Sequence, residues 1–180
     1  SVNSGPVKTV PEPYPMQLDA LRGIREIREQ GKNKALIVSA TGTGKTFLSA
    51  FDARSVEAKR LLFVVHRETI ARKAMDSFQA VFGDSRTYNI YSGRERDGTG
   101  DFVFATVQTL SRRNNLQIFP PDHFDYIVVD ESHRAGARSY EVFLNYFETK
   151  FLLGMTATPE RTDGQDIFKY FDHNIAFEIR

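Results

Sequence analysis

The chain has 180 residues, of which 41% are hydrophobic and 26% are charged, a balance typical of one globular domain. No apolar run approaches the roughly 18 residues of a membrane span. No charged-then-apolar leader opens the sequence, so we expect no membrane partner and place the protein in the cytoplasm. Cysteine is absent, which excludes disulfides, and the net charge of +1 gives no general sign of a nucleic-acid partner.

The N-terminal end is predicted to be a tail. Residues 1–13 are rich in Pro, Ser and Gly and show no periodicity, so we expect a flexible segment ahead of a folded domain over 14–180. The first helix is predicted next, because apolar residues recur every three positions from Leu18 to Ile27. Gly31 is a plausible end for that helix.

Short apolar runs then alternate with segments of helical spacing. The runs cover 35–40, 60–66, 87–92, 101–107, 126–130 and 151–157. They are mostly continuous rather than alternating, which indicates strands buried on both sides. Strands that alternate with helices predict an α/β fold with a mainly parallel sheet. The stretch 92–101 is expected to be a solvated loop, and 165–171 a short helix.

The first candidate site follows the earliest apolar run, since ligands of such sheets bind at the carboxyl ends of strands. Residues 39–46 read SATGTGKT, which matches the phosphate-binding pattern G-x-x-x-x-G-K-[ST] except that Ser39 replaces the first Gly. Gly42 and Gly44 let backbone N–H groups point at phosphate oxygens, and the next helix presents its N-terminus to the same anion. The residues expected around the phosphates are Thr41, Gly42, Thr43, Gly44, Lys45 and Thr46.

Side chains complete this site. Lys45 is expected to neutralise phosphate charge, and the Thr46 hydroxyl to reach Mg²⁺. A second strand, which we expect to neighbour the first in the parallel sheet, ends in Asp130 and Glu131. We expect Asp130 to be a Mg²⁺ ligand and Glu131 to polarise the attacking water. A zinc site and a charged turn without chemistry are the alternatives. Both are disfavoured, because no two His residues have ligand spacing and the two motifs jointly predict one site.

Five motifs in order carry a family resemblance. They are SATGTGKT, FVVHRETIARKA, FATVQTL, VVDESH and GMTATPERTDG, preceded by YPMQLDAL. The sequence resembles the DExH-type helicases and translocases of superfamily two, in the branch of type III restriction subunits and excision-repair helicases. The resemblance covers about residues 14–180. It implies a three-layer RecA-like P-loop NTPase domain, the first of two lobes, that uses ATP and Mg²⁺.

The resemblance also implies roles for residues outside the phosphate loop. Gln17 would read the adenine edge and Tyr14 would stack on the base. The residues implied to couple nucleotide state to nucleic-acid grip are His133, Thr156 and Thr158. Those implied to lie along the nucleic-acid backbone are Arg67, Thr106 and Gln108. Arg94 and Arg96 could touch phosphates as well, although a loop without that role is favoured for them.

The second lobe that the resemblance implies would carry an arginine finger, so we expect this chain alone to be a weak ATP hydrolase. The partners implied are that second lobe and a nucleic acid, with DNA favoured over RNA. Two alternatives stay open. One is a non-catalytic module in which nucleotide switches the binding of nucleic acid or protein. The other is the motor subunit of a restriction or repair nuclease whose nuclease lies elsewhere.

Overall fold

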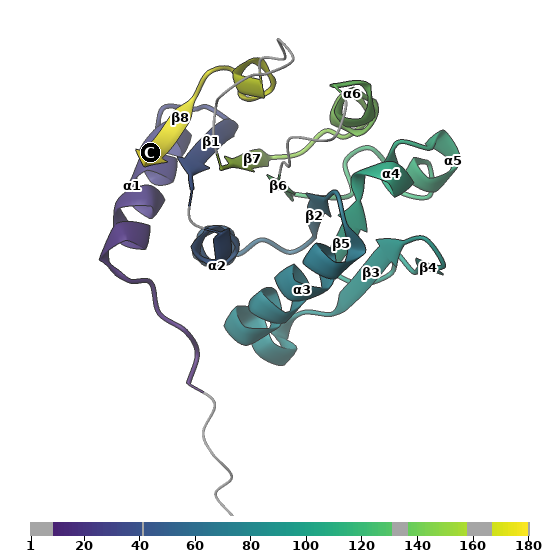
Figure 1. Ribbon diagram of the computed structural model, residues 1–180, viewed down its shortest axis with the longest axis horizontal. Helices are drawn as coiled ribbons and strands as arrows, with labels where there is room; N and C mark the ends of the chain where they lie inside the picture. The colour runs from purple at the N-terminus through teal and green to yellow at the C-terminus, as the bar shows by residue number, and fades with distance from the viewer. Residues whose placement is uncertain (1–8, 41, 131–136, 158–166, 180) are drawn as a thin grey trace, which may run out of the picture.

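A single twisted sheet organises the computed structural model, which describes residues 9–40, 42–130, 137–157 and 167–179 (Figure 1). Within these ranges the strands lie in the order β4-β3-β5-β2-β6-β7-β1-β8. The strands are β1 (Lys34–Ser39), β2 (Leu61–Val65), β3 (Tyr88–Ser92), β4 (Glu95–Arg96), β5 (Phe102–Thr106), β6 (Tyr126–Asp130), β7 (Phe151–Thr156) and β8 (Ile175–Ile179). The helices are α1 (Pro15–Glu29), α2 (Gly42–Ser55), α3 (Glu68–Phe82), α4 (Val107–Leu110), α5 (Arg113–Leu116) and α6 (Ala137–Tyr146), with 3₁₀ turns η1 (Gly83–Ser85) and η2 (Ile167–Phe171).

The predicted α/β fold with a mainly parallel sheet is confirmed. Among the described strands every pairing is parallel except that of β3 with β4. Every residue of β2, β5 and β7 is buried, as the continuous apolar runs predicted. None of the helices in the described ranges has the length and apolar character that crossing a bilayer requires.

Helices cover both faces of the sheet and bury a separate apolar cluster on each. Figure 1 shows α1, α2 and α3 on one face, and α4, α5 and α6 on the other. The first cluster includes Ile24 and Phe78, with Phe63 from the sheet, and the second includes Phe143 and Phe124. The result is the expected three-layer arrangement.

Two segments differ from expectation. The stretch 92–101, predicted as a loop, contains the two-residue strand β4, which forms an antiparallel hairpin with β3. Residues 175–179, for which no strand was predicted, form β8 beside β1. Neither segment has the continuous apolar run that identified the other strands, because β4 is exposed and β8 is only partly buried.

The first helix is fixed to the sheet at two points. At Gly23, an added Cβ would lie 1.9 Å from the carbonyl oxygen of Ala176, so α1 lies directly on the backbone of β8. Near its other end, Arg28 Nη2 donates to Asp52 Oδ2 at 2.6 Å, and the Tyr126 hydroxyl donates to the same oxygen at 2.6 Å. Asp52 is 2% exposed, so this network joins α1, α2 and β6 inside the protein.

Candidate functional site

The glycine-rich loop has the structural context that its sequence predicts. Strand β1 ends at Ser39, which is 4% exposed, and α2 begins at Gly42. Thr43, Gly44, Lys45 and Thr46 therefore lie in the first turn or so of a 14-residue helix. Strand, tight loop and helix N-terminus are the three parts that a phosphate-binding loop requires. The small side chain of Ser39 is accommodated where the general pattern has Gly.

Lys45 and Asp130 interact through their charges at this edge of the sheet. Lys45 is 8% exposed. Burial lowers the pKa of its ammonium group, and the carboxylate of Asp130 acts in the opposite direction. Burial likewise raises the pKa of Asp130, and the Lys45 charge opposes that change. For both groups desolvation changes the pKa more than the partner charge does. Each charge is therefore held in a partly water-excluded place where electrostatic forces are strong.

One detail of the predicted geometry is wrong. We expected Asp130 on a strand adjacent to β1, but β7 lies between β1 and β6. Asp130 is level with Met155 of β7, and Met155 is level with Ile37 of β1. Thr156, the last residue of β7, is 1% exposed and thus lies between the strand of the glycine-rich loop and the strand of Asp130.

The donor set fits Mg²⁺ better than zinc. Mg²⁺ is usually held by one or two carboxylates together with phosphate oxygens and water. The hydroxyl of Thr46, one residue from Lys45, and the carboxylate of Asp130 offer oxygen ligands of that kind. Within the described ranges, no three His, Cys, Asp or Glu side chains gather into a group that could hold a metal ion.

Gln17 joins the first helix to the glycine-rich loop. Its side-chain amide donates to the carbonyl of Gly44 at 3.0 Å and accepts from the backbone N–H of Tyr14 at 3.2 Å. Gln17 is 5% exposed, whereas Tyr14 is 51% exposed. The Tyr14 hydroxyl lies against Gly44, where an added Cβ would come within 2.5 Å of it. The predicted base-reading pair thus lies directly on the phosphate loop.

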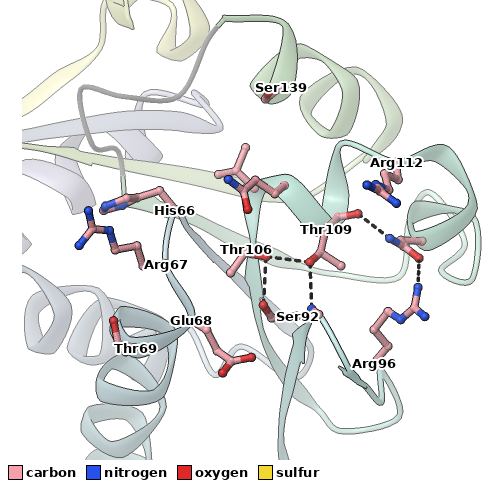
Figure 2. A pocket seen from close by; sticks show the side chains of 14 residues that line it. His66, Arg67, Glu68, Thr69, Ser92, Arg96, Thr106, Thr109, Arg112 and Ser139 are labelled. Atoms are coloured by element: carbon pink, nitrogen blue, oxygen red, sulfur yellow. Dashed lines mark hydrogen bonds between the residues drawn. The ribbon is translucent and has the colours of Figure 1, made fainter.

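A cavity opens at another part of the same edge of the sheet. It has a volume of about 1040 Å³ and is lined by the start of α3, the β3–β4 hairpin, the end of β5, α4, α5 and Ser139 (Figure 2). Arg67, Thr106 and Gln108, which the sequence assigned to nucleic acid, all line it. The structure therefore brings Arg67 together with Thr106 and Gln108, which lie about 40 positions later in the sequence. We call this cavity the polar groove.

Thr106 has a different position from the other two. Its hydroxyl is hydrogen-bonded to Ser92 at 3.2 Å and to Thr109 at 2.7 Å, and Thr106 is 5% exposed. Figure 2 shows this chain of hydroxyl groups across the floor of the groove. Arg67 and Gln108 are exposed and available to a ligand. Thr106 thus holds β3 and β5 together, while Arg67 and Gln108 form the accessible surface.

Sequence reasoning missed part of the groove. Arg112 and Asn115 also line it. Arg96 lines it too, although the sequence favoured a loop position without a phosphate contact for this residue. Arg96 Nη1 donates to Asn115 Oδ1 at 2.9 Å. Arg112 lies two residues after the motif FATVQTL, and that position was the available signal. Asn115 had no signal, because its contacts depend on how α5 packs.

Four of the predicted site residues lie outside the described residues. They are Thr41, Glu131, His133 and Thr158. Their roles stay predictions from the sequence.

Comparison with known proteins identifies a family. Residues 11–161 match the family described as "Type III restriction enzyme, res subunit". The chain is 32% identical over 167 residues to a type I restriction enzyme EcoAI endonuclease subunit of Escherichia coli, covering 86% of this chain and 20% of that protein. It is 30% identical over 173 residues to a putative ATP-dependent helicase IRC3 of Saccharomyces cerevisiae, covering 87% of this chain and 25% of that protein. The chain thus spans about a fifth to a quarter of the length of these relatives.

Solved structures share the fold. The helicase domain of Pyrococcus furiosus Hef superposes with a TM-score of 0.70 at 18% identity, covering 88% of this chain and 37% of that one. The SWI2/SNF2 ATPase core of Sulfolobus solfataricus superposes with a TM-score of 0.67 at 18% identity, covering 91% of this chain and 37% of that one. At this identity the likeness concerns the fold, and it agrees with the RecA-like architecture expected from the motifs.

Proposed function

The chain belongs to the family of the type III restriction enzyme res subunit, and on that basis we propose that it is the ATP-binding lobe of a nucleic-acid-dependent ATPase, a DExH-type helicase or DNA translocase. One observation carries the proposal. The glycine-rich loop and Asp130 lie along the same edge of the sheet as the polar groove. A nucleotide site and a polymer site side by side on one lobe are what an ATP-driven motor needs. The lobe would extend over 14–180 after a tail at 1–13.

The nucleotide site is proposed to hold Mg²⁺–ATP, which supplies the phosphoanhydride bond to be cleaved. The first turn of α2 and Lys45 would bind the phosphates, Thr46 and Asp130 would hold the ion, and Glu131 would orient the attacking water. Gln17 would recognise the adenine, and its bond to Gly44 would connect that recognition to the loop. Because Lys45 is largely removed from water, its charge acts more strongly on a phosphate than it would in solution.

The polar groove is proposed to hold a nucleic-acid backbone. Arginine, hydroxyl and amide groups line it, and these donors contact phosphates and sugars without reading sequence. Its described lining contains no Phe, Tyr or Trp on which a base could stack. The Sulfolobus protein is described in complex with double-stranded DNA, and we propose DNA as the polymer here.

Further partners follow from the same reasoning. The relatives extend well beyond this chain, and a second RecA-like lobe in the parent protein would close over ATP. A nuclease domain elsewhere in that protein would make it a restriction or repair machine. The absence of cysteine is compatible with a reducing compartment, and we propose the cytoplasm.

The test is to measure Mg²⁺–ATP binding and ATP turnover with and without double-stranded DNA, single-stranded DNA and RNA. Lys45→Ala should abolish most of the ATP affinity, whereas Lys73→Ala, an exposed lysine of α3, should leave it unchanged. Glu131→Gln should keep ATP binding and lose turnover. Turnover that no polymer stimulates, together with a Glu131→Gln protein that behaves like the original, would favour a nucleotide-switched binding module instead.

A further inference from the structure

The β3–β4 hairpin forms a fixed wall of the polar groove. Its outer strand β4 has only two residues, Glu95 and Arg96, whose side chains point to opposite faces of the strand. Glu95 pairs with Arg72 of α3 at 2.8 Å, and Arg96 donates to Asn115 of α5. One hairpin is thereby held from two sides. The wall has a defined position although β4 itself is too short to be stable alone.

Asn115 is held in turn by the groove's own backbone. Its side-chain Nδ2 donates to the backbone carbonyl of Thr109 at 3.0 Å, and its own backbone carbonyl accepts from the Tyr91 hydroxyl at 2.7 Å. Its Oδ1 is therefore fixed as the acceptor for Arg96. Figure 2 shows the dashed line that reaches the end of the Arg96 side chain, with Arg112 on the same side of the cavity and Arg67 on the other. Asn115 acts as a positioning residue.

The charge at this end of the groove is not compensated. In the described part of the chain, neither Arg96 nor Arg112 forms an ion pair with a carboxylate. The acidic residues near Arg96 have other partners: Glu68 and Glu95 pair with Arg72 at 3.6 and 2.8 Å, and Asp97 accepts from the backbone N–H and hydroxyl of Thr99. Arg96 is exposed and uses one of its five N–H donors on the neutral amide of Asn115, so donors remain for a ligand.

We propose that Arg96 and Arg112 form a second phosphate-binding point of the polar groove, distinct from that of Arg67, and that Asn115 orients Arg96 toward a phosphodiester of the DNA strand. This proposal rests on the proposed function. Arginine suits the role because its planar fork matches phosphate oxygens and it is always charged. The neighbouring acid Glu95, which would otherwise cancel that charge, is turned away by the strand and held by Arg72.

The experiment measures binding of a short labelled DNA duplex to the chain by fluorescence anisotropy, over a series of salt concentrations. Arg96→Gln and Arg112→Gln should each lower the affinity and reduce the slope of log affinity against log salt by about one. Arg94→Gln is the matched control, because Arg94 is exposed in the same hairpin but does not line the groove. Asn115→Ala should weaken binding while it keeps the slope, since the number of charges is unchanged. Arg96→Lys should restore the slope but not the full affinity.

The outcomes separate the two proposals. The original chain could bind DNA with a clear salt dependence while Arg96→Gln and Arg112→Gln behave like Arg94→Gln. In that case the second phosphate-binding point is wrong, but the proposal that the polar groove binds DNA still stands. If the original chain binds no DNA even at low salt, both this inference and the proposed nucleic-acid function fail. Thermal unfolding of each arginine variant should match that of the original chain, because the substituted arginines are exposed.

Discussion

At the residue scale, the burial of Asp130 has a consequence for the pH dependence of nucleotide binding. Its pKa is raised above the ordinary 3.8 by burial, with Lys45 opposing the change. The carboxylate therefore takes up a proton at a higher pH than an ordinary aspartate does. A protonated carboxyl is a poor Mg²⁺ ligand, so we expect Mg²⁺-dependent ATP affinity to fall on acidification before ordinary aspartates titrate.

The measurement is ATP affinity against pH with Mg²⁺ present and with it removed by a chelator. Asp130→Asn is the control, since it should bind Mg²⁺–ATP more weakly and lose this part of the pH dependence. ATP itself also titrates in acid, and the variant shares that background. An identical pH profile for the original chain and Asp130→Asn would contradict the role of Asp130.

Single residues differed in how well the sequence predicted them. Asp130 ends an apolar run and Lys45 lies in the motif that follows another, so the place of each in the fold could be predicted. Arg96 and Asn115 could not be assigned, because their contact joins a hairpin to a helical turn and depends on packing. The predicted adjacency of β1 and β6 was wrong, since strand order is not readable from the local pattern.

At the element scale, the close approach of α1 to β8 makes Gly23 sensitive to any side chain. Alanine in a helix interior normally stabilises by about 1 kcal/mol relative to glycine. At Gly23 its Cβ would lie 1.9 Å from a backbone oxygen, which cannot rotate away. We therefore expect Gly23→Ala to destabilise the fold by about 1–3 kcal/mol, the usual cost of overpacking.

Urea unfolding of Gly23→Ala measures whether the free energy of unfolding falls as expected. Arg25→Ala is the control on the exposed face of the same helix. Because α1 also carries Gln17, the variant should bind ATP more weakly. A gain in stability would mean that α1 does not lie on β8 as described.

Elements with strong apolar patterns were predicted well, and weak ones were not. Strands β2, β5 and β7 are wholly buried, so burial on both faces left a continuous signal in their sequence. Strand β8 is a partly exposed outer strand, and its backbone pairing with β1 leaves no comparable signal.

At the scale of the whole molecule, the two sites occupy separate halves of one edge. The polar groove lies at the ends of β3, β5 and β2, and the nucleotide site at the ends of β6, β7 and β1. In a motor of the proposed type a second lobe would contribute an arginine to the ATP phosphates, worth roughly a thousandfold or more in rate. We expect this chain alone to bind Mg²⁺–ATP and to turn it over slowly.

The comparison is between steady-state turnover by this chain and by a longer protein that includes the second lobe, at saturating ATP and DNA. Lys45→Ala in each background corrects for contaminating ATPases. Equal, fast turnover in both proteins would show that this lobe alone completes the catalytic site.

The position of β1 also constrains how the protein is made. This early strand pairs with β7 on one side and with β8 on the other, and both follow it by more than 110 residues. A ribosome that has just released Ser39 must still synthesise everything up to Phe151 before β1 gains its first neighbour, several seconds at roughly 5–20 residues per second. During that time the apolar run 35–39 has no sheet partner. The glycine-rich loop therefore acquires its shape only after β7 has been made, and a nascent chain stopped before β7 would have no formed phosphate loop.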